Sequence, residues 1–307
     1  PLGPYVNRFE DMLDEYLGVN NVVALSAGTA AIHIALALLG IGKGDEVICQ
    51  SMTFSASANP IVYLGGSPVF VDSEPMTWNM DPALLRTAIE ERIKLTSRKP
   101  KAIIVVHLYG MPAKMDEIMK IAAEYDIPVV EDAAEAIGSE YDGHKCGTIG
   151  RFGILSFNGN KMITTSGGGA LICPDKESAQ RALFLATQAR ENRPYYYHET
   201  VGYNYRLSNV SAAIGCAQME ELDWRVNRRR AIHGIYADAL RDNPVVSVHT
   251  NPDDTFNSNY WLSTILLDDA SPVSADDLRQ KLASHNIETR LLWRPMHMQP
   301  VYKDAPA

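Results

Sequence analysis

The sequence is poor in cysteine, and its cysteines do not have the spacing of a metal site. Its 307 residues include four, which are far apart and form no CxxC pair and no cluster with histidine: Cys49, Cys146, Cys173 and Cys216. This pattern argues against a zinc site and a disulfide framework, and we expect no metal. Reduced thiols fit a cytoplasmic protein best.

Long apolar runs and an excess of positive charge are also missing. The longest apolar candidate, residues 30–41, contains His33 and is shorter than the roughly 18 residues that a membrane helix needs. The chain has 28 Lys and Arg against 37 Asp and Glu, and its net charge of −9 gives no general attraction to nucleic acid or anionic membranes. The one notable basic run, residues 228–230, fits a solvated or subunit-contact face better than a nucleic-acid patch. We therefore expect no membrane and no nucleic acid as partners.

The sequence lacks both glycine-rich nucleotide fingerprints, GxGxxG and GxxxxGK[ST]. Without them, an NAD-type dehydrogenase or a P-loop enzyme has no phosphate-binding glycines. A different turn, Ser26-Ala27-Gly28-Thr29, joins an expected strand at 22–25 to an expected helix at 30–39. Backbone N–H groups at such a helix start favour a phosphate, and Thr29 could add a hydroxyl, but a simple N-cap fits the turn at least as well.

Strands and helices are expected to alternate along the first half of the chain. Strands at 46–49, 68–71, 102–107 and 128–131 are separated by helices at 55–63, 82–93 and 116–125. This alternation predicts an α/β fold, with a mainly parallel sheet and helices on both of its faces. At this length we expect a large domain, 1–222, and a smaller α+β C-terminal domain, 223–307, which looks incomplete. A helical pattern at 210–240 connects the two, followed by an expected strand at 260–267 and a helix at 274–285.

Ligands of parallel α/β sheets bind beyond the carboxyl ends of the strands. The residues that end or follow the expected strands are Gly28, Thr29, Phe54, His107, Asp132 and Ser156. We therefore expect these side chains to converge on one crevice. Three of them also have plainer interpretations, since Asp132 can cap a helix, Phe54 can belong to the core and Ser156 can be an ordinary strand residue.

Lys161 lies between two expected strands, one at 153–157 and one that begins at Ala170. The run Gly167–Gly169 follows it, and glycines let a backbone or a ligand approach closely. Taken alone, a lysine in a polar loop is most simply a solvated surface residue. Beside the crevice residues, however, a partly desolvated amine is a usable nucleophile toward an aldehyde. A phosphate site, a carboxylate, an aromatic ring and a lysine together suit pyridoxal phosphate.

Six motifs extend this suggestion to nearly the whole chain. In order, they are SAGTAAIHIAL, MTFSASANPIVYLGGSPVFVDSE, VVEDAAEAIGSEY, SFNGNKMITTSGGGAL, GYNYRLSNVSAAIG and WRPMHMQPVY. Together they resemble the DegT/StrS family of pyridoxal-phosphate-dependent nucleotide-sugar aminotransferases. The resemblance implies an aspartate-aminotransferase-like fold of type I. One departure is Ser166-Gly167-Gly168-Gly169, where many members read GEGG.

The resemblance implies a role for each crevice residue. Lys161 would be the catalytic residue and would bind the aldehyde of pyridoxal 5′-phosphate as a Schiff base. Asp132 would pair with the pyridine nitrogen, Phe54 would stack on the ring, and Glu135 would lie near the ring hydroxyl. The phosphate would be held by Gly28, Thr29 and Ser156, and by Asn204 of the neighbouring subunit. The last role implies a homodimer with shared active sites.

The resemblance also implies amino transfer from an amino acid, with L-glutamate expected, to C4 of a nucleotide-linked 4-keto-6-deoxy sugar. SASANP, HLYGMP and SFNGNKMITTSGGGA are most similar to 4-aminotransferases of bacillosamine-type pathways. These act on UDP-2-acetamido-4-keto-6-deoxyhexose for surface glycan or glycoprotein biosynthesis. Arg206, Arg294 and His297 are candidate sugar-nucleotide contacts, although each fits a surface or interface residue equally well.

Two other functions fit the same fold. One is a pyridoxal-phosphate-dependent sugar dehydratase, a branch of the family in which histidine replaces the lysine; the lysine at position 161 favours the aminotransferase. The other is a non-catalytic regulator that binds a sugar or the cofactor, since a fold alone does not determine function. Intact Lys161 and Asp132 argue against the regulator.

Overall fold

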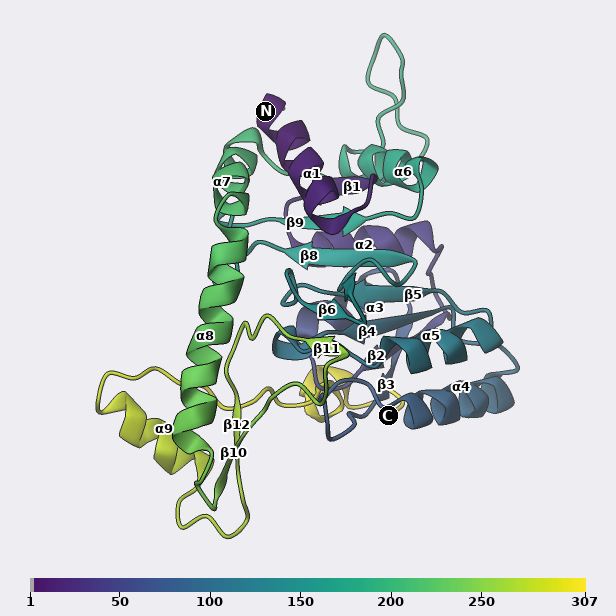
Figure 1. The fold of residues 1–307 in the computed structure, drawn as a ribbon. Coiled ribbons are helices and arrows are strands. Elements are labelled where there is room, and N and C mark those ends of the chain that lie inside the picture. Colours follow the sequence, from purple (N-terminus) through teal and green to yellow (C-terminus); the bar gives the residue numbers. More distant parts are fainter. Residues whose placement is uncertain (1–2) are drawn as a thin grey trace.

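A computed structural model describes residues 3–307, and its centre is a seven-stranded sheet with the strand order β1-β9-β8-β5-β4-β2-β3 (Figure 1). The strands of this sheet are β1 (Val22–Leu25), β2 (Glu46–Gln50), β3 (Ser67–Val71), β4 (Ala102–Val106), β5 (Val129–Asp132), β8 (Phe152–Ser156) and β9 (Gly169–Ile172). The α-helices are α1 (Pro4–Leu17), α2 (Gly28–Leu38), α3 (Ser55–Tyr63), α4 (Pro82–Thr96), α5 (Met115–Glu124), α6 (Lys176–Ala186), α7 (Asn209–Met219), α8 (Leu222–Leu240) and α9 (Ala275–Ala283).

The middle of the sheet is parallel. Strand β2 pairs in parallel with β3 and β4, and β5 pairs in parallel with β4 and β8. Strand β9 runs antiparallel to both β8 and β1, so β1 points the same way as β8. The carboxyl ends of β1, β2, β4, β5 and β8 therefore meet at one edge, together with the amino end of β9. The predicted α/β fold with a mainly parallel sheet is confirmed.

Both faces of the sheet are buried, because successive side chains of a strand point to opposite faces. In β1, Val23 and Leu25 belong to the core cluster that contains α2, α3 and α6. Val22 and Ala24 belong to the cluster that contains α1 and α7. A third cluster holds α4 and α5 on the side of β3 and β4. The strands are consequently mostly apolar rather than alternating, as expected for a sheet covered twice, and their polar residues, such as Gln50 and Asp132, lie at strand ends.

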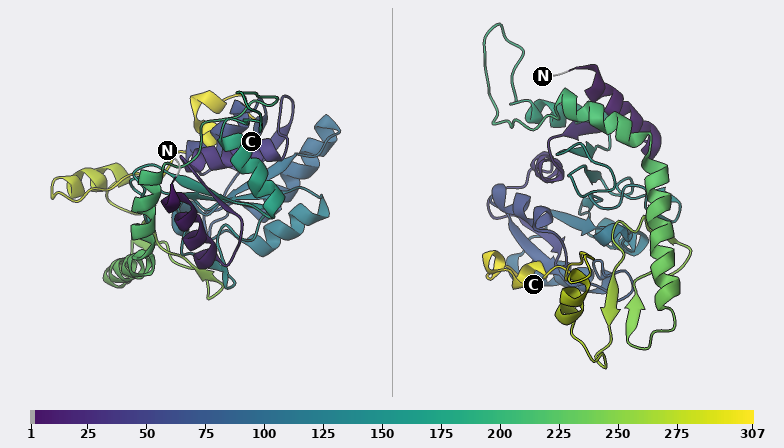
Figure 2. Two further views of the ribbon diagram at one scale, coloured as in Figure 1. Left: turned by 90° about the horizontal axis from the view of Figure 1, so that it is seen from above. Right: turned by 90° about the vertical axis from the view of Figure 1, so that its left-hand side faces the viewer.

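Helix α8 runs along one side of the molecule and leads to a two-stranded sheet of β10 (Val246–Val248) and β12 (Ile265–Leu267) and to α9 (Figures 1 and 2). Two stretches then return to the large sheet. Strand β11 (Phe256–Asn257) pairs with β6 (Glu140–Tyr141), which also pairs with β7 (His144–Lys145). Near the end of the chain, Met296 and Tyr302 lie in the core cluster of α2. Because these segments after residue 223 pack against the large domain, a domain boundary between residues 222 and 223 remains a proposal.

The structure differs from two expected elements. Of the expected strand at 260–267, only Ile265–Leu267 is a strand; its expected first residue, Tyr260, has a left-handed backbone with φ of 46°. The expected helix at 210–240 is two helices, since Glu221 leaves the helical region at φ −107°, ψ 2° and separates α7 from α8.

The connection between α6 and α7 stands away from the rest of the chain (Figures 1 and 2). It carries the exposed side chains of Tyr195, Tyr196 and Tyr197. No helix within residues 3–307 is both long and apolar enough to cross a membrane.

Candidate active site

A cavity of about 1430 Å³ opens at the carboxyl edge of the sheet, where the sequence predicted a crevice. Its lining includes Gly28 and Thr29 after β1, Phe54 after β2, Asp132 at the end of β5, Glu135 after β5, Ser156 at the end of β8, and Lys161. The far wall of the cavity comes from the C-terminal part of the chain, between Trp261 and Trp293. The fold thus brings together residues that are up to 267 positions apart, counting from Ser26 to Trp293.

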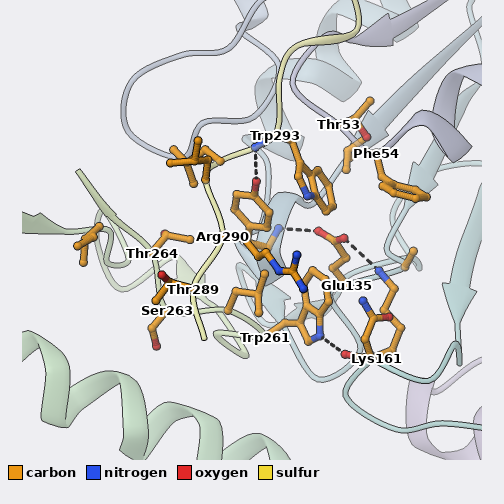
Figure 3. A pocket seen from close by; sticks show the side chains of 18 of the residues that line it. Thr53, Phe54, Glu135, Lys161, Trp261, Ser263, Thr264, Thr289, Arg290 and Trp293 are labelled. Carbon is orange, nitrogen blue, oxygen red and sulfur yellow. Dashed lines mark hydrogen bonds and ion pairs between the residues drawn. The ribbon is translucent and has the colours of Figure 1, made fainter. Parts of the chain in front are cut away.

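Lys161 lies in a loop that is closed by backbone hydrogen bonds between β8 and β9. The amide of Phe157 donates to the carbonyl of Gly168 at 2.8 Å, and the amide of Thr165 donates to the carbonyl of Phe157 at 2.9 Å. The side chain of Lys161 is only 14% exposed, and its Nζ lies 3.0 Å from Oε1 of Glu135 (Figure 3). The interpretation of Lys161 as a solvated surface residue, which a polar loop favours, is therefore wrong.

Asp132 is held in place by two hydrogen bonds. Ser57 Oγ donates to its Oδ2 at 2.6 Å, and the backbone N–H of Ala134 donates to its Oδ1 at 3.2 Å. The residue is 5% exposed and lines the cavity. The bond from Ala134 resembles a local cap, as the plainer interpretation expected, but the carboxylate also faces the cavity in which Lys161 lies.

The start of α2 has no side-chain N-cap. Its first residue, Gly28, lines the cavity together with Thr29 and Ser156, so the positive end of the helix faces this space. Strand β9 approaches the start of α2 very closely here: a Cβ on Gly169 would lie 2.4 Å from the backbone nitrogen of Gly28. The simple N-cap interpretation is wrong, and the uncapped helix start is suited to an anion such as phosphate.

Comparison with known proteins identifies the family of the chain and the class of its reaction. The profile of the DegT/DnrJ/EryC1/StrS aminotransferase family matches residues 1–307. The chain belongs to this family. Its members depend on pyridoxal phosphate, and the chain is a pyridoxal-phosphate-dependent sugar aminotransferase.

Three similar proteins illustrate the relationship. EpsN of Bacillus subtilis, which carries "pyridoxal phosphate-dependent aminotransferase" in its name, is 52% identical over 306 residues, covering 99% of this chain and 78% of EpsN. The GDP-perosamine synthase of Escherichia coli O157:H7 is 41% identical, covering 98% of this chain and 80% of the synthase. The crystal structure of a family aminotransferase from Brucella abortus superposes with a TM-score of 0.92 at 34% identity, covering 99% of this chain and 80% of that one.

The cavity of this aminotransferase fits the cofactor of its family. It offers a lysine amine for the aldehyde, a buried carboxylate for the ring nitrogen, and an uncapped helix start for the phosphate. Phe54 lines this cavity and is 57% exposed as a residue, so part of its aromatic surface is accessible for stacking.

Glu135 is the only carboxylate in contact with Lys161 among residues 3–307. Its other oxygen, Oε2, accepts the backbone N–H of Tyr109 at 2.8 Å. Burial raises the pKa of Glu135, although the ammonium of Lys161 and this backbone donor oppose the shift. The aminotransferase therefore holds a buried proton-binding group beside the lysine.

Glu135→Gln is expected to change how the stability of the cofactor-free protein depends on pH. Because the pKa of Glu135 is raised in the fold, its proton is retained at pH values where the unfolded chain has lost it. The contribution of this proton to the free energy of unfolding is complete below the ordinary pKa of glutamate, and it is lost as the pH rises through the raised pKa of Glu135 in the fold. Thermal melts between about pH 4 and pH 8 should show the wild-type Tm falling relative to the variant. A difference that stays constant or rises would contradict this account.

Trp261 is a site residue that sequence reasoning missed. Its ring lies 4.2 Å from Nζ of Lys161, and its Nε1 donates to the carbonyl of Asn160 at 2.8 Å (Figure 3). The preceding Asn259 fixes this segment, because its side-chain amide donates to the carbonyls of Glu135 and Ile137, both at 2.9 Å. Trp261 is 3% exposed and covers the lysine from the C-terminal part of the chain.

Trp293 was missed as well. Its ring lies edge-on to Tyr109 with centroids 4.9 Å apart, and 5.5 Å from the ring of Phe54. Its backbone N–H donates to the hydroxyl of Tyr109 at 3.0 Å (Figure 3). The two tryptophans thus line the cavity on the wall that the C-terminal part of the chain forms.

Some predicted residues lie outside the cavity. Arg206 binds residues outside the cavity: its guanidinium pairs with both carboxylate oxygens of Glu10 and donates to the carbonyl of Ala24 at 3.1 Å. We withdraw it as a sugar-nucleotide contact. His107, expected at the crevice, is fully buried, with Nε2 3.0 Å from Glu131 and Nδ1 accepting the amide of Ala113.

The remaining candidates lie on the surface. Asn204 is exposed, and its Oδ1 accepts Nε2 of Gln188 at 2.9 Å. Arg294 and His297 are also exposed, and Nδ1 of His297 lies 2.7 Å from Oγ of Ser51. None of the three lines the cavity of its own chain, so each can act only toward a neighbouring subunit or a ligand that extends beyond the cavity.

Proposed function

We propose that this aminotransferase moves the amino group of an amino acid, with L-glutamate as the expected donor, to C4 of a nucleotide-linked 4-keto-6-deoxy sugar. The acceptor that we expect is UDP-2-acetamido-4-keto-6-deoxyhexose, and the product would serve surface glycan or glycoprotein biosynthesis. The observation that carries the proposal is the meeting of Lys161, Glu135 and Asp132 in one cavity. The similar GDP-perosamine synthase, whose name describes the synthesis of a nucleotide-linked amino sugar, supports this class of acceptor.

When bound, pyridoxal phosphate supplies an electron sink for the carbon that loses a proton. Lys161 would bind the cofactor covalently and, once released by the incoming amine, would carry a proton away from the α-carbon of the donor. Glu135 lies 3.0 Å from its Nζ and would stabilise the ammonium form between the two proton transfers. In the second half of the cycle, the same amine would return a proton to C4 of the sugar.

The other residues would hold the cofactor in register with Lys161. Asp132 would keep the ring nitrogen protonated, because an anionic carboxylate stabilises a cation beside it. Ser57 fixes that carboxylate through its 2.6 Å hydrogen bond. Phe54 would stack on the ring, and the phosphate would lie at the uncapped start of α2 with Gly28, Thr29 and Ser156.

We further propose a homodimer with shared active sites, in which Asn204 binds the phosphate of the neighbouring subunit. The exposed position of Asn204 outside its own cavity supports this arrangement. Mixing inactive Lys161→Ala and Asn204→Ala subunits should restore up to about a quarter of the wild-type activity, since one of the two sites in a hybrid dimer is intact. Hybrids that are confirmed by mass spectrometry and remain inactive would contradict the shared site.

The acceptor is identified by a substrate screen. The purified enzyme, with L-glutamate, is offered 4-keto-6-deoxy sugars linked to UDP, dTDP and GDP, and products are detected by mass spectrometry. We expect the keto oxygen of the UDP-2-acetamido sugar to be replaced by an amine, with 2-oxoglutarate released in equal amount. Conversion of only a 3-keto sugar, or of only GDP sugars, would overturn the proposed acceptor while leaving the aminotransferase assignment intact.

A further inference from the structure

Residues 258–261 fix the wall of the cavity that covers Lys161. Besides the bonds from Asn259 described above, the backbone N–H of Trp261 donates to Oδ1 of Asn259 at 2.8 Å. Between these two residues, Tyr260 has a left-handed backbone with φ of 46°. A bulky residue adopts this conformation only where its surroundings hold it there. The position of Trp261 therefore depends on what packs against Tyr260.

Helix α8 supports this segment through two residues that lie one turn apart. The ring of His233 stacks flat on the ring of Tyr260, with centroids 3.5 Å apart and an angle of 5° between the planes. Arg230 donates from Nε to the carbonyl of Ser258 at 2.9 Å. The hydroxyl of Tyr260 also accepts the backbone N–H of Asn251 at 3.1 Å. The ring of Tyr260 is thus held against α8 by His233.

His233 is an unusual residue for such a stack. It is 4% exposed, and within residues 3–307 neither of its ring nitrogens has a hydrogen-bond partner. A phenylalanine would fill the same place without burying two unpaired polar atoms. Burial, and to a smaller extent the neighbouring His249, lower the pKa of His233 to about 4. The ring is therefore neutral at pH 7, and the packing around it opposes its protonation.

The groups around His233 do not compensate a positive charge on its ring. The titratable side chains one turn away on α8 and those of the segments packed beside it are Arg229, Arg230, Tyr236, His249 and Tyr260. None of these carries a negative charge at pH 7. The carboxylate of Glu74 acts on His249, whose ring stacks on Trp78, and it is already paired with Nζ of Lys114 at 3.1 Å. A protonated His233 would thus be a buried and unpaired cation.

We propose that His233 is a positioning residue, which holds Trp261 over Lys161 while its ring is neutral and releases residues 258–261 when the ring is protonated. The inference rests on the proposed role of Lys161 in proton transfer. The ring takes up a proton by leaving Tyr260 for water, because a buried charge needs a hydrogen-bond partner. Without the stack, the left-handed backbone at Tyr260 loses its support and the cover of Lys161 opens. Acid therefore uncovers the lysine while the sheet stays folded.

Hydrogen exchange of the holoenzyme, measured by mass spectrometry between pH 7.5 and pH 5, tests the release without any turnover. Exchange of the amides of residues 258–261, corrected for the intrinsic effect of pH, reports how often the segment opens. The closed form is fully favoured above the ordinary histidine pKa of about 6.5 and is progressively disfavoured as the pH falls toward 4, so opening should increase by about 30-fold. His233→Phe keeps the stack but takes up no proton, so its opening should not change with pH.

Turnover at pH 7.5 tests whether the stack positions the reacting amine. His233→Ala removes the stack at every pH, and we expect kcat for oxo-acid release to fall by about 10-fold. His233→Phe should restore the wild-type kcat. Tyr260→Leu removes the other ring of the stack and gives the same test from the opposite side, with the same expected loss.

The matched control is His285→Phe, which replaces an exposed histidine just beyond the end of α9 and outside the cavity. It should keep both the wild-type kcat and the opening in acid. The proposal is overturned if wild-type exchange of residues 258–261 is independent of pH, if His233→Phe opens in acid as the wild type does, or if His233→Ala keeps the wild-type kcat. An enzyme that releases no oxo acid from any amino donor would contradict the proposed function instead, and the exchange profile tests His233 separately from it.

Discussion

Lys161→Ala is expected to reduce amino transfer by about 10⁴-fold or more, because one side chain both binds the cofactor and carries the proton. The structure gives the cavity no second amine at this place: within residues 3–307, Lys161 is the only lysine that lines it. The loss should appear in kcat measured with saturating donor and acceptor. The folded structure should persist, because the change removes one ion pair and leaves the backbone bonds of the loop intact.

Lys101→Ala is the matched control for this prediction. Lys101 pairs with Asp45 at 2.9 Å and lies outside the cavity, so its loss changes the net charge equally without touching the site. Wild-type turnover is expected for Lys101→Ala. Lys161→Ala protein with normal melting behaviour and more than a few per cent of wild-type turnover would show that another group performs the proton transfer.

Asp132→Asn is expected to reduce kcat by about 10³-fold. Asparagine matches the shape of aspartate but carries no charge, so the ring nitrogen would lose the anion that keeps it protonated. Because Ser57 can still donate to the amide oxygen, the packing around residue 132 should change little. The measurement is kcat in a coupled assay of oxo-acid release, with cofactor content determined separately.

Ser57→Ala separates the charge of Asp132 from its position. It removes the 2.6 Å hydrogen bond but keeps the carboxylate, so we expect a loss of no more than about 10-fold. Equal losses for Ser57→Ala and Asp132→Asn would mean that Asp132 acts through its geometry alone, and the electrostatic role would have to be abandoned.

The sequence predicted the parts of the site that lie at strand ends. Gly28, Phe54, Asp132 and Ser156 could be found because strand and helix periodicities locate the carboxyl edge of a parallel sheet. The same reasoning placed Lys161 between two strands. It could not decide between an N-cap and a phosphate site at α2, because that depends on whether a side chain caps the helix in space.

Contacts between distant segments could not be predicted from the sequence. Trp261 reaches Asn160 across 101 positions, and no local pattern distinguishes it from a core tryptophan. Arg206 was misjudged for the same reason, since its partner Glu10 lies 196 positions away. The basic run 228–230 was interpreted as a solvated or subunit-contact face, but its third residue, Arg230, donates to the backbone carbonyls of Gly138 and Ser258.

The most direct test of the central claim is to locate the lysine that carries the cofactor. The purified holoenzyme is reduced with borohydride, digested, and searched by mass spectrometry for the peptide that bears the phosphopyridoxyl group. We predict that the label lies on Lys161, in the peptide that follows Arg151, and that Lys161→Ala takes up no label there. A label on another lysine, or a wild-type protein that binds no pyridoxal phosphate, would contradict the account.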